Sequence, residues 1–285
     1  MPVGVLDVGS NTTRLLVARV EHGVIVAVDK EKVRLPLGEE IERFGAVSDV
    51  HVAAVAKAVR KLAKRARSHH VESLDVFLTA PGRQSSNAAE LVAALTRAAG
   101  VSVRVLSTDE EGRLAYGGAI ATAPIDLPAR IAVCDVGGAS TEIAIGSPGA
   151  SPEWVESVDL GSVRLTTRVA SVAEAQAETA AAFRHVESQH VDAALAVGGS
   201  ARAARRLVGS HLGSDELAEA LRLVENESER SISRRFGVDR ARARILPAGI
   251  VVLAEVQRKL GVPLHVCNGG IREGAVLESA AVRAA

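Results

Sequence analysis

The chain has 285 residues, of which 47% are hydrophobic, 24% charged and 2% aromatic. This composition indicates a globular protein whose core is built from Val, Leu, Ile and Ala, and it favours α/β packing over an aromatic-rich all-β sandwich. Basic and acidic residues number 34 each, so net charge indicates neither nucleic acid nor a membrane as a partner. The apolar runs are too short to span a membrane, and no signal peptide is recognised, so a cytoplasmic location is expected.

The chain contains an internal sequence repeat. Residues 3–13 and 131–141 both read as an apolar strand, an aspartate, a glycine turn and hydroxyl residues that open a second strand. Second strands are predicted at 15–20 and 143–145, and third strands at 24–28 and 154–158, so each half begins as a β-meander. Cys134 lies inside the repeat and Cys267 near the end of the chain, and both are expected to be reduced core residues.

After each meander the pattern changes to helix alternating with strand. Helices are predicted at 50–67, 87–99 and from 109 in the first half, with strands at 73–79 and 103–106. In the second half we expect a helix at 172–189, a strand at 193–197, several helices over 200–260, a strand at 264–267 and a last helix from 273. The sequence therefore predicts two related α/β lobes with the glycine turns facing each other across a cleft. The first lobe is assigned to residues 1–117, completed by the helix 274–285, and the second to residues 118–273.

The two facing turns are candidate phosphate sites. Backbone N–H groups in such a turn form a nest for phosphate oxygens, and glycine allows close approach. The candidate residues are Gly9, Ser10, Asn11 and Thr12 in the first turn and Gly137, Gly138, Ala139 and Ser140 in the second. Asp7, Asp135 and Glu142 are candidate Mg²⁺ ligands, because hard cations prefer carboxylate oxygen. The alternative is that both are ordinary hairpin turns capped by aspartate.

Two further glycine turns lie between a strand and a helix. Gly199 and Ser200 open a helix that carries several arginines, and a helix N-terminus near arginine is a natural anion site. Arg272 lies in the other turn, which spans residues 269–274. Neither turn matches the Walker or the dinucleotide-binding pattern.

Taken together, these motifs resemble the exopolyphosphatase / guanosine pentaphosphate phosphatase (Ppx/GppA) family. The matching segments occur in the family's order along nearly the whole chain. They are Asp7-Val8-Gly9-Ser10-Asn11-Thr12, the segment 79–87 with Arg83 and Asn87, Asp109-Glu110-Glu111-Gly112-Arg113, Asp135-Val136-Gly137-Gly138-Ala139-Ser140-Thr141-Glu142, Leu160-Gly161-Ser162-Val163-Arg164 and Gly270-Ile271-Arg272-Glu273-Gly274.

The resemblance implies the duplicated actin-like (RNase H-like) ATPase superfold in its short two-lobed form, with the site in the cleft. It implies that Glu111 is the general base for an attacking water and that Arg83 grips a substrate phosphate. Asp135, Glu142 and Asp7 would hold Mg²⁺, and a further need for K⁺ stays open. On local sequence alone, Glu110 and Glu111 could simply favour the helix N-terminus.

Two departures from the family pattern bear on catalysis. Ala139 replaces a glycine of the second turn, and Pro81-Gly82 precedes Arg83. Either change is expected to weigh against efficient turnover more than against the fold.

Two basic clusters, at 57–67 and 230–244, are either solubilising surfaces or tracks for successive phosphates. The main prediction is a hydrolase that releases terminal orthophosphate from inorganic polyphosphate. The alternatives are a guanosine pentaphosphate 5′-phosphohydrolase, a sugar or acetate kinase of the same superfold, a non-catalytic polyphosphate or nucleotide sensor, and an actin-like filament protein. A homodimer is implied by the resemblance alone.

Overall fold

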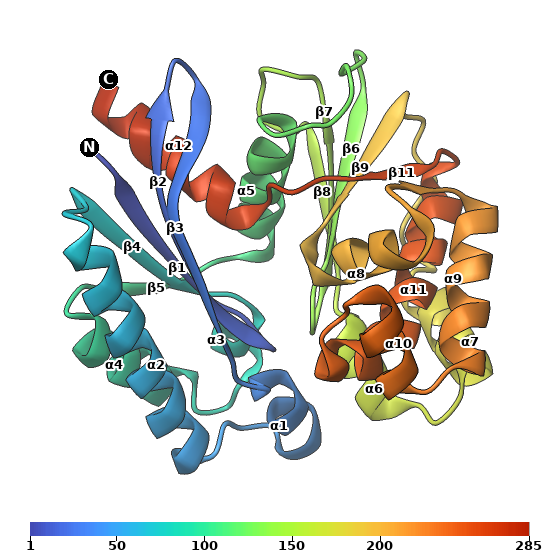
Figure 1. Cartoon of the computed structure of the whole chain (residues 1–285), viewed down its shortest axis with the longest axis horizontal. Coiled ribbons are helices and arrows are strands. Elements are labelled where there is room, and N and C mark those ends of the chain that lie inside the picture. The colour runs from blue at the N-terminus through green and yellow to red at the C-terminus, as the bar shows by residue number, and fades with distance from the viewer. Residues whose placement is uncertain (285) are drawn as a thin grey trace.

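The computed structural model describes the backbone of residues 1–284 and the side chains of residues 1–281. Within this part of the chain, two mixed sheets with flanking helices form two lobes (Figure 1). The first sheet contains β1 (Val3–Val8), β2 (Thr12–Glu21), β3 (Val24–Arg34), β4 (Ser73–Leu78) and β5 (Val103–Val105). The second contains β6 (Ile131–Val136), β7 (Thr141–Gly146), β8 (Trp154–Val158), β9 (Ala193–Val197), β10 (His211–Leu212) and β11 (Leu264–Val266).

The helices of the first lobe are α1 (Leu37–Phe44), α2 (Asp49–Ser68), α3 (Ala80–Gln84), α4 (Ala88–Ala99) and α5 (Thr108–Ile120). Those of the second are α6 (Ser162–Arg168), α7 (Val172–Ala182), α8 (Gly198–Val208), α9 (Ser214–Asn226), α10 (Glu229–Phe236) and α11 (Arg240–Leu260). The last helix, α12 (Ile271–Ala284), returns to the first lobe, so both termini lie at that end of the molecule (Figure 1).

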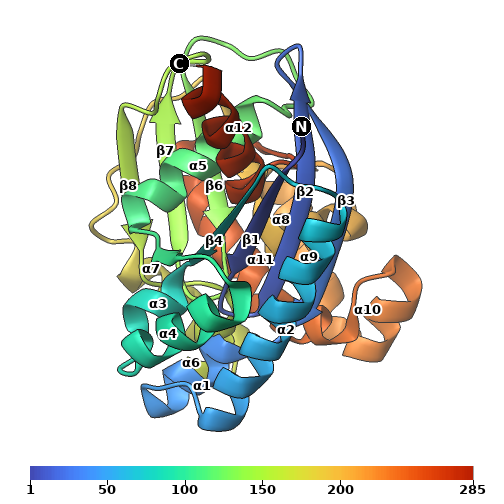
Figure 2. The same cartoon turned by 90° about the vertical axis from the view of Figure 1, so that its left-hand side faces the viewer.

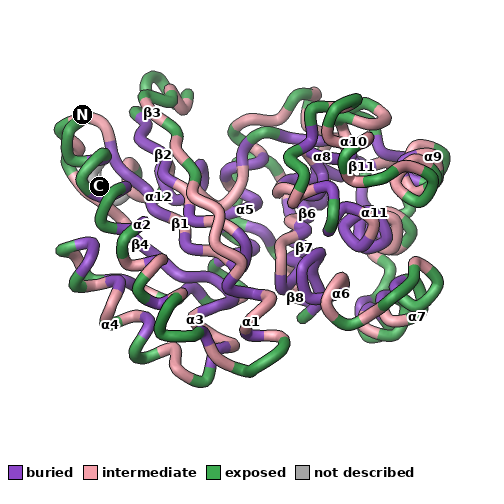
Figure 3. Tube along the Cα trace, turned by 60° about the horizontal axis from the view of Figure 1, so that its bottom comes forward, coloured by how far each residue is buried: buried purple, intermediate pink, exposed green. Residues whose placement is uncertain are grey.

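The predicted repeat is confirmed by strand order. The sheets read β3-β2-β1-β4-β5 and β8-β7-β6-β9-β11, and β10 extends the edge of the second. In both, the first two strands of the repeat are antiparallel, and the first strand pairs in parallel with the strand that follows the meander. The central strands β1 and β6 are therefore buried, as Figure 3 shows, and the aspartate near the end of each meets the cleft.

Helices cover both faces of each sheet. In the first lobe, α2 and α4 pack on one face, and α2 buries a stripe of Val52, Val55, Val59 and Leu62 at helical spacing. On the other face, α5 and α12 lie between the two sheets (Figures 1 and 2). The remaining face of the second sheet is covered by α8, α9 and α11, among others. This arrangement places α5 in contact with both lobes.

The α5–α12 contact depends on glycine. A β-carbon at Gly118 would overlap the carbonyl oxygen of Gly270, and one at Gly274 would overlap the carbonyl oxygen of Leu114. The two helix backbones touch there because no side chains intervene.

On the opposite side of the cleft, ion pairs bridge the lobes. Glu42 of α1 accepts from Arg164 Nε at 2.8 Å and from Arg168 Nε at 2.6 Å. Glu39 accepts from Arg244 Nη2 at 2.7 Å. The lobes are thus joined by backbone packing on one side and by charge pairs on the other.

Most predicted elements are present, and α1, α3 and α6 lie in segments for which no element was predicted. The predicted helix 172–189 ends at Ala182, because Phe183 turns into the core and leaves the helix. Strand β3 runs on to Arg34, and β10 lies in a segment predicted as helical. The proposed lobe boundary after residue 117 falls inside α5 and stays a prediction, and the end of the predicted helix 274–285 at residue 285 lies outside the described residues. Within the described chain, each helix is too short or too polar to cross a membrane.

Candidate active site

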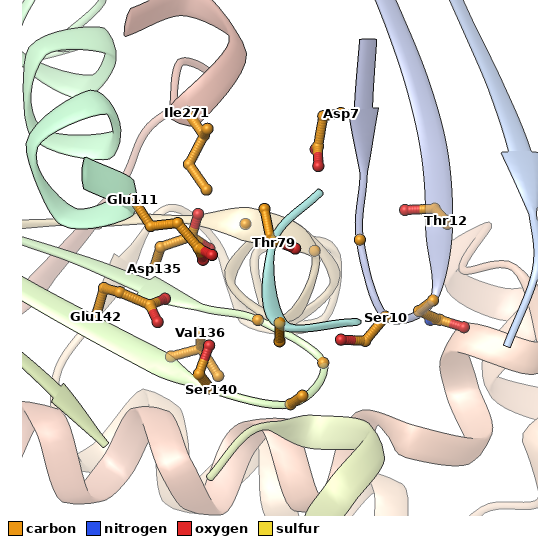
Figure 4. A pocket seen from close by; sticks show the side chains of 18 of the residues that line it. Asp7, Ser10, Thr12, Thr79, Glu111, Asp135, Val136, Ser140, Glu142 and Ile271 are labelled. Atoms are coloured by element: carbon orange, nitrogen blue, oxygen red, sulfur yellow. The ribbon is translucent and has the colours of Figure 1, made fainter. Parts of the chain in front are cut away.

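The two glycine turns face each other across a cavity of about 100 Å³ between the lobes (Figure 4). A β-carbon at Gly138 would lie 3.1 Å from Cβ of Ser10, which shows how closely the turns approach. Every residue predicted in the turns lines this cavity: Gly9, Ser10, Asn11, Thr12, Gly137, Gly138, Ala139 and Ser140. In Figure 4, Asp7 and Ser10 lie on one side, and Asp135 and Glu142 on the other.

The same hydrogen bond closes each turn. The N–H of Gly9 donates to the carbonyl of Thr12 at 3.1 Å, and that of Gly137 donates to the carbonyl of Ser140 at 3.0 Å. These two N–H groups therefore shape the turns and are not available to a ligand. A different donor is available, since Nδ2 of Asn11 is buried at the cavity and has no partner among the described residues. A buried amide without a partner is costly, so this position favours an acceptor ligand.

Glu110 and Glu111 have separate roles at the start of α5. Ser107 and Glu110 form a capping box, in which Ser107 Oγ accepts from the Glu110 N–H at 3.1 Å and Glu110 Oε2 accepts from the Ser107 N–H at 2.7 Å. Glu111 takes no part in the cap. The residue is 3% exposed, and it lines the cavity (Figure 4). The helix-terminus explanation thus accounts for Glu110, and Glu111 needs another one.

Arg83 holds Glu111. Its Nη1 donates to Oε1 of Glu111 and, at 2.6 Å, to the carbonyl of Leu106, while Nη2 is buried without a partner among the described residues. Burial raises the pKa of Glu111 well above its usual value, the charge of Glu142 raises it further, and Arg83 opposes both effects. The arginine therefore favours the ionised, base-competent form of the carboxylate.

Three more carboxylates face the cavity. Burial raises the pKa of Glu142 to about 7, against hydrogen bonds from Ser140 and Ser157, and burial also raises the pKa of Asp7 and of Asp135. In the described residues these groups do not form a ready cluster of three direct metal ligands. They fit Mg²⁺ in another way, because this ion is commonly held by one or two carboxylates, waters and substrate phosphate. A cation would also relieve the mutual repulsion of these buried acids.

Positive charge reaches the cavity from both lobes. Arg14 of β2 and Arg242 of α11 line it, and the N-terminus of α8 contributes Gly198 and Gly199. Gly198 has a φ of 88°, and a β-carbon there would overlap Oδ1 of Asp135, so only glycine lets the helix start so close to the carboxylate. The cavity therefore combines carboxylates with cations and a helix N-terminus, which suits an anion bound together with a metal ion.

Comparison with known proteins identifies the family. The model of the Ppx/GppA phosphatase family matches residues 16–235. The chain belongs to the Ppx/GppA phosphatase family. Exopolyphosphatase 1 of Mycobacterium tuberculosis is 27% identical over 97% of this chain and 88% of its own length. An uncharacterised protein of Streptomyces coelicolor, SCO0757, is 28% identical over 97% of this chain and 90% of its own length.

Solved structures of the family share the fold. A Ppx/GppA family member of Aquifex aeolicus superimposes with a TM-score of 0.83 at 22% identity, covering 99% of this chain and 98% of its own. An exopolyphosphatase of Cytophaga hutchinsonii gives 0.87 at 17% identity, covering 98% and 97% respectively. The predicted fold class, a duplicated α/β fold of the actin-like superfold with two lobes, is confirmed.

Most of the predicted site residues come together. The three predicted metal ligands, Glu111 and Gly199 line the cavity with the two turns. Arg83 contacts it through Glu111. Arg272 lines a smaller neighbouring cavity with Asp7, Arg14 and Asp135. Ser200 is not brought in, since its hydroxyl is buried beside Gly249 of α11.

Sequence reasoning missed several lining residues, namely Arg14, Thr79, Ala80, Val136, Gly198, Arg242 and Ile271. Arg14 had a signal, because a short turn after Asp7 fixes the register that pairs these two residues across β1 and β2. No feature of the sequence distinguished Arg242 from its basic neighbours. The choice depends on how α11 is rotated against the second sheet.

Both departures from the family pattern are accommodated. Among the described residues, His22 and His70 are the non-glycine residues with positive φ, so Ala139 needs no left-handed backbone. Pro81 lies in the first turn of α3, where a missing N–H costs nothing. A β-carbon at Gly82 would lie 2.7 Å from Val105, so glycine lets α3 pack against β5.

Proposed function

We propose that this chain releases terminal orthophosphate from inorganic polyphosphate by attack of water, with Mg²⁺ as the metal ion. One observation carries the proposal: a buried carboxylate, Glu111, is held by Arg83 and lies in a cavity between two facing phosphate-type turns. Membership of the Ppx/GppA phosphatase family, whose members are phosphohydrolases, supports hydrolysis over the kinase alternative.

The proposed reaction needs little covalent chemistry from the protein. Glu111 accepts a proton from water, the water oxygen bonds to the terminal phosphorus, and the bridging P–O bond breaks. The products are orthophosphate and a chain shortened by one phosphate, which carries the charge of the leaving oxygen. The turns and Arg14 hold the terminal phosphate in line with the water, so positioning and charge stabilisation supply most of the acceleration.

Asp7, Asp135 and Glu142 are the residues that would hold Mg²⁺. When bound, the ion would neutralise phosphate oxygens and so favour charge transfer to the leaving group. The protein groups are set up for this independently, since burial raises the pKa of all three carboxyls and makes a nearby cation favourable.

The proposal is favoured over a non-catalytic sensor. That alternative depended on Ala139 and Pro81, and both fit their backbone positions, with Arg83 paired to Glu111. A sensor also has no need for a buried base beside the anion site.

The test is phosphate release from long-chain polyphosphate, tripolyphosphate and guanosine pentaphosphate, each with Mg²⁺ and with EDTA. We expect metal-dependent release that is fastest from inorganic polyphosphate. Faster release from guanosine pentaphosphate would favour the nucleotide phosphatase. Binding of polyphosphate by folded protein without release from any substrate would refute the enzyme.

A further inference from the structure

An open groove of about 340 Å³ leads from the cavity along β3. Its first wall is formed by β2 and β3, with Arg14, Lys32 and Arg34. Its second wall is formed by α8, the α10–α11 loop and the start of α11, with Arg202, Arg206 and Arg242. Thr12, Arg14, Gly199 and Arg242 line both the groove and the cavity, so the two are continuous.

The groove has an excess of positive charge. Asp239 is the acidic side chain that lines it, against six arginines and lysines. Among the described residues, Lys32, Arg202 and Arg242 have no carboxylate within 4.0 Å, and burial lowers the pKa of both arginines to about 10. Half-buried guanidinium groups without a counter-ion are unfavourable until an anion binds.

The spacing of charge on β3 suits an extended anion. Lys30, Lys32 and Arg34 alternate along the strand, so their side chains leave one face at intervals of roughly 7 Å. Lys30 and Lys32 line the continuation of the groove with Arg272. A row of cations beside a strand matches a linear polyanion better than a single compact phosphate.

Asp239 occupies the groove as an internal anion. As N-cap of α11 it accepts from the N–H of Arg242 at 3.2 Å, and its carboxylate also pairs with Arg34 Nη1 at 2.7 Å. The side chain is 57% exposed, so an incoming anion can replace it at Arg34.

We propose that this groove binds the phosphates that follow the terminal one in a linear inorganic polyphosphate, and that they displace Asp239 from Arg34. The inference rests on the proposed function and adds the direction in which the chain leaves the site. The described residues that line the groove include no aromatic side chain, so it offers no stacking surface for a purine. The groove therefore favours inorganic polyphosphate over a nucleotide.

The first test replaces Lys32, which is exposed and has no ion pair among the described residues, so Lys32→Gln leaves the fold intact. Its matched control is Lys61→Gln, the same change of charge on the exposed side of α2. We expect Lys32→Gln to raise KM for long-chain polyphosphate roughly fivefold, with kcat unchanged, because one charge-assisted phosphate contact is lost. The effect should be smaller for tripolyphosphate and should shrink as salt is added. An equal effect of Lys61→Gln would show that net charge, not the groove, is responsible.

The second test is expected to lower KM instead of raising it. Asp239→Asn keeps the N-cap, because asparagine caps as well as aspartate, and removes the charge that competes for Arg34. We expect KM for long-chain polyphosphate to fall about threefold at low salt, as the groove gains one net positive charge. An unchanged or raised KM would overturn the displacement of Asp239.

Direct binding separates this inference from the proposed function. Fluorescently labelled polyphosphate is titrated into Glu111→Gln protein, alone and combined with Lys32→Gln or Lys61→Gln. If the wild-type protein releases no phosphate but Lys32→Gln still weakens binding, the proposed function fails and the groove stands. If phosphate is released and neither KM nor binding responds to Lys32→Gln, the groove fails and the proposed function stands.

Discussion

The turn of the first lobe and the turn of the second are built alike, but the residues that lie opposite their aspartates carry opposite charge. In each, a buried strand presents an aspartate and a glycine N–H closes the turn at nearly the same distance, 3.1 and 3.0 Å. The cross-strand partners differ. Asp7 lies opposite Arg14 in the register of β1 and β2, whereas Asp135 lies opposite Glu142 in that of β6 and β7.

This difference explains how two copies of one scaffold can serve as an anion site and as a cation site. Residues opposite each other in an antiparallel pair have neighbouring side chains, so one cross-strand position sets the local charge. Arg14 makes the first turn suitable for an anion. Glu142, with Glu111 nearby, makes the second suitable for a cation and a base. We expect substitutions on the two sides to produce different kinetic defects.

The largest effect is expected at Glu111. Glu111→Gln removes the proposed base while keeping the shape of the side chain, and kcat should fall at least ~10²-fold, with polyphosphate binding largely kept. The matched control is Glu110→Gln, which preserves the capping box because glutamine also serves there. Near-normal turnover by Glu111→Gln would remove the proposed mechanism.

Next comes Glu142, which tests the cationic role of the second turn. Glu142→Gln removes a carboxylate proposed to hold Mg²⁺, and the Mg²⁺ concentration for half-maximal activity should rise roughly 10- to 100-fold. Titration of activity with Mg²⁺ measures this. Arg14→Gln serves as the comparison and should not raise the Mg²⁺ requirement, because it removes a positive charge that acts on Asp7 and Asp135. If both variants raise the Mg²⁺ concentration for half-maximal activity equally, the two turns do not have separate roles in anion and cation binding.

A smaller effect is expected at Arg14 itself. Arg14→Gln should raise KM for polyphosphate about tenfold and change kcat less, because a charge-assisted contact to phosphate contributes on the order of 1.5–3 kcal/mol. Arg14→Lys should restore only part of the affinity, since lysine keeps the charge but not the planar fork. A normal KM in Arg14→Gln would contradict the anionic role of the first turn.

The smallest effect is on stability and its dependence on pH. Glu142 has a folded pKa of about 7, above its ordinary value of 4.5, so the folded state holds a proton that the unfolded state has lost. Stability from this group is full below pH 4.5 and is lost as pH rises towards 7, by at most about 1.4 kcal/mol per pH unit. Metal-free protein should therefore melt at a lower temperature at pH 7 than at pH 5.

Two further measurements isolate the contribution of Glu142 to the slope of melting temperature against pH. Glu142→Gln should flatten it, because glutamine does not titrate. Mg²⁺ should flatten it too, because the ion stabilises the carboxylate. A slope that persists in Glu142→Gln would assign the effect to other acids.

Glu111 was indicated by the resemblance to the Ppx/GppA family, whereas local pattern was enough to predict the meanders and the facing turns, because alternation and turn chemistry act over a few residues. It could not separate Glu110 from Glu111, since only the packing of α5 decides which carboxylate caps the helix and which enters the cavity. It also extended α7 to residue 189, because helical composition continues after the point where Phe183 is drawn into the core. Arg242 and Arg202 reach the site from helices whose rotation is set by tertiary packing.

The glycine contact between α5 and α12 fixes the spacing of the whole site. Glu111 lies seven residues before Gly118 on α5, about two helical turns, and Arg272 is the second residue after Gly270, in the first turn of α12. Because no side chain lies between the two backbones, this contact sets the distance between Glu111 and Arg272. A single added methyl group at Gly118 would force the two helices apart and move both groups at once, although neither would have been altered.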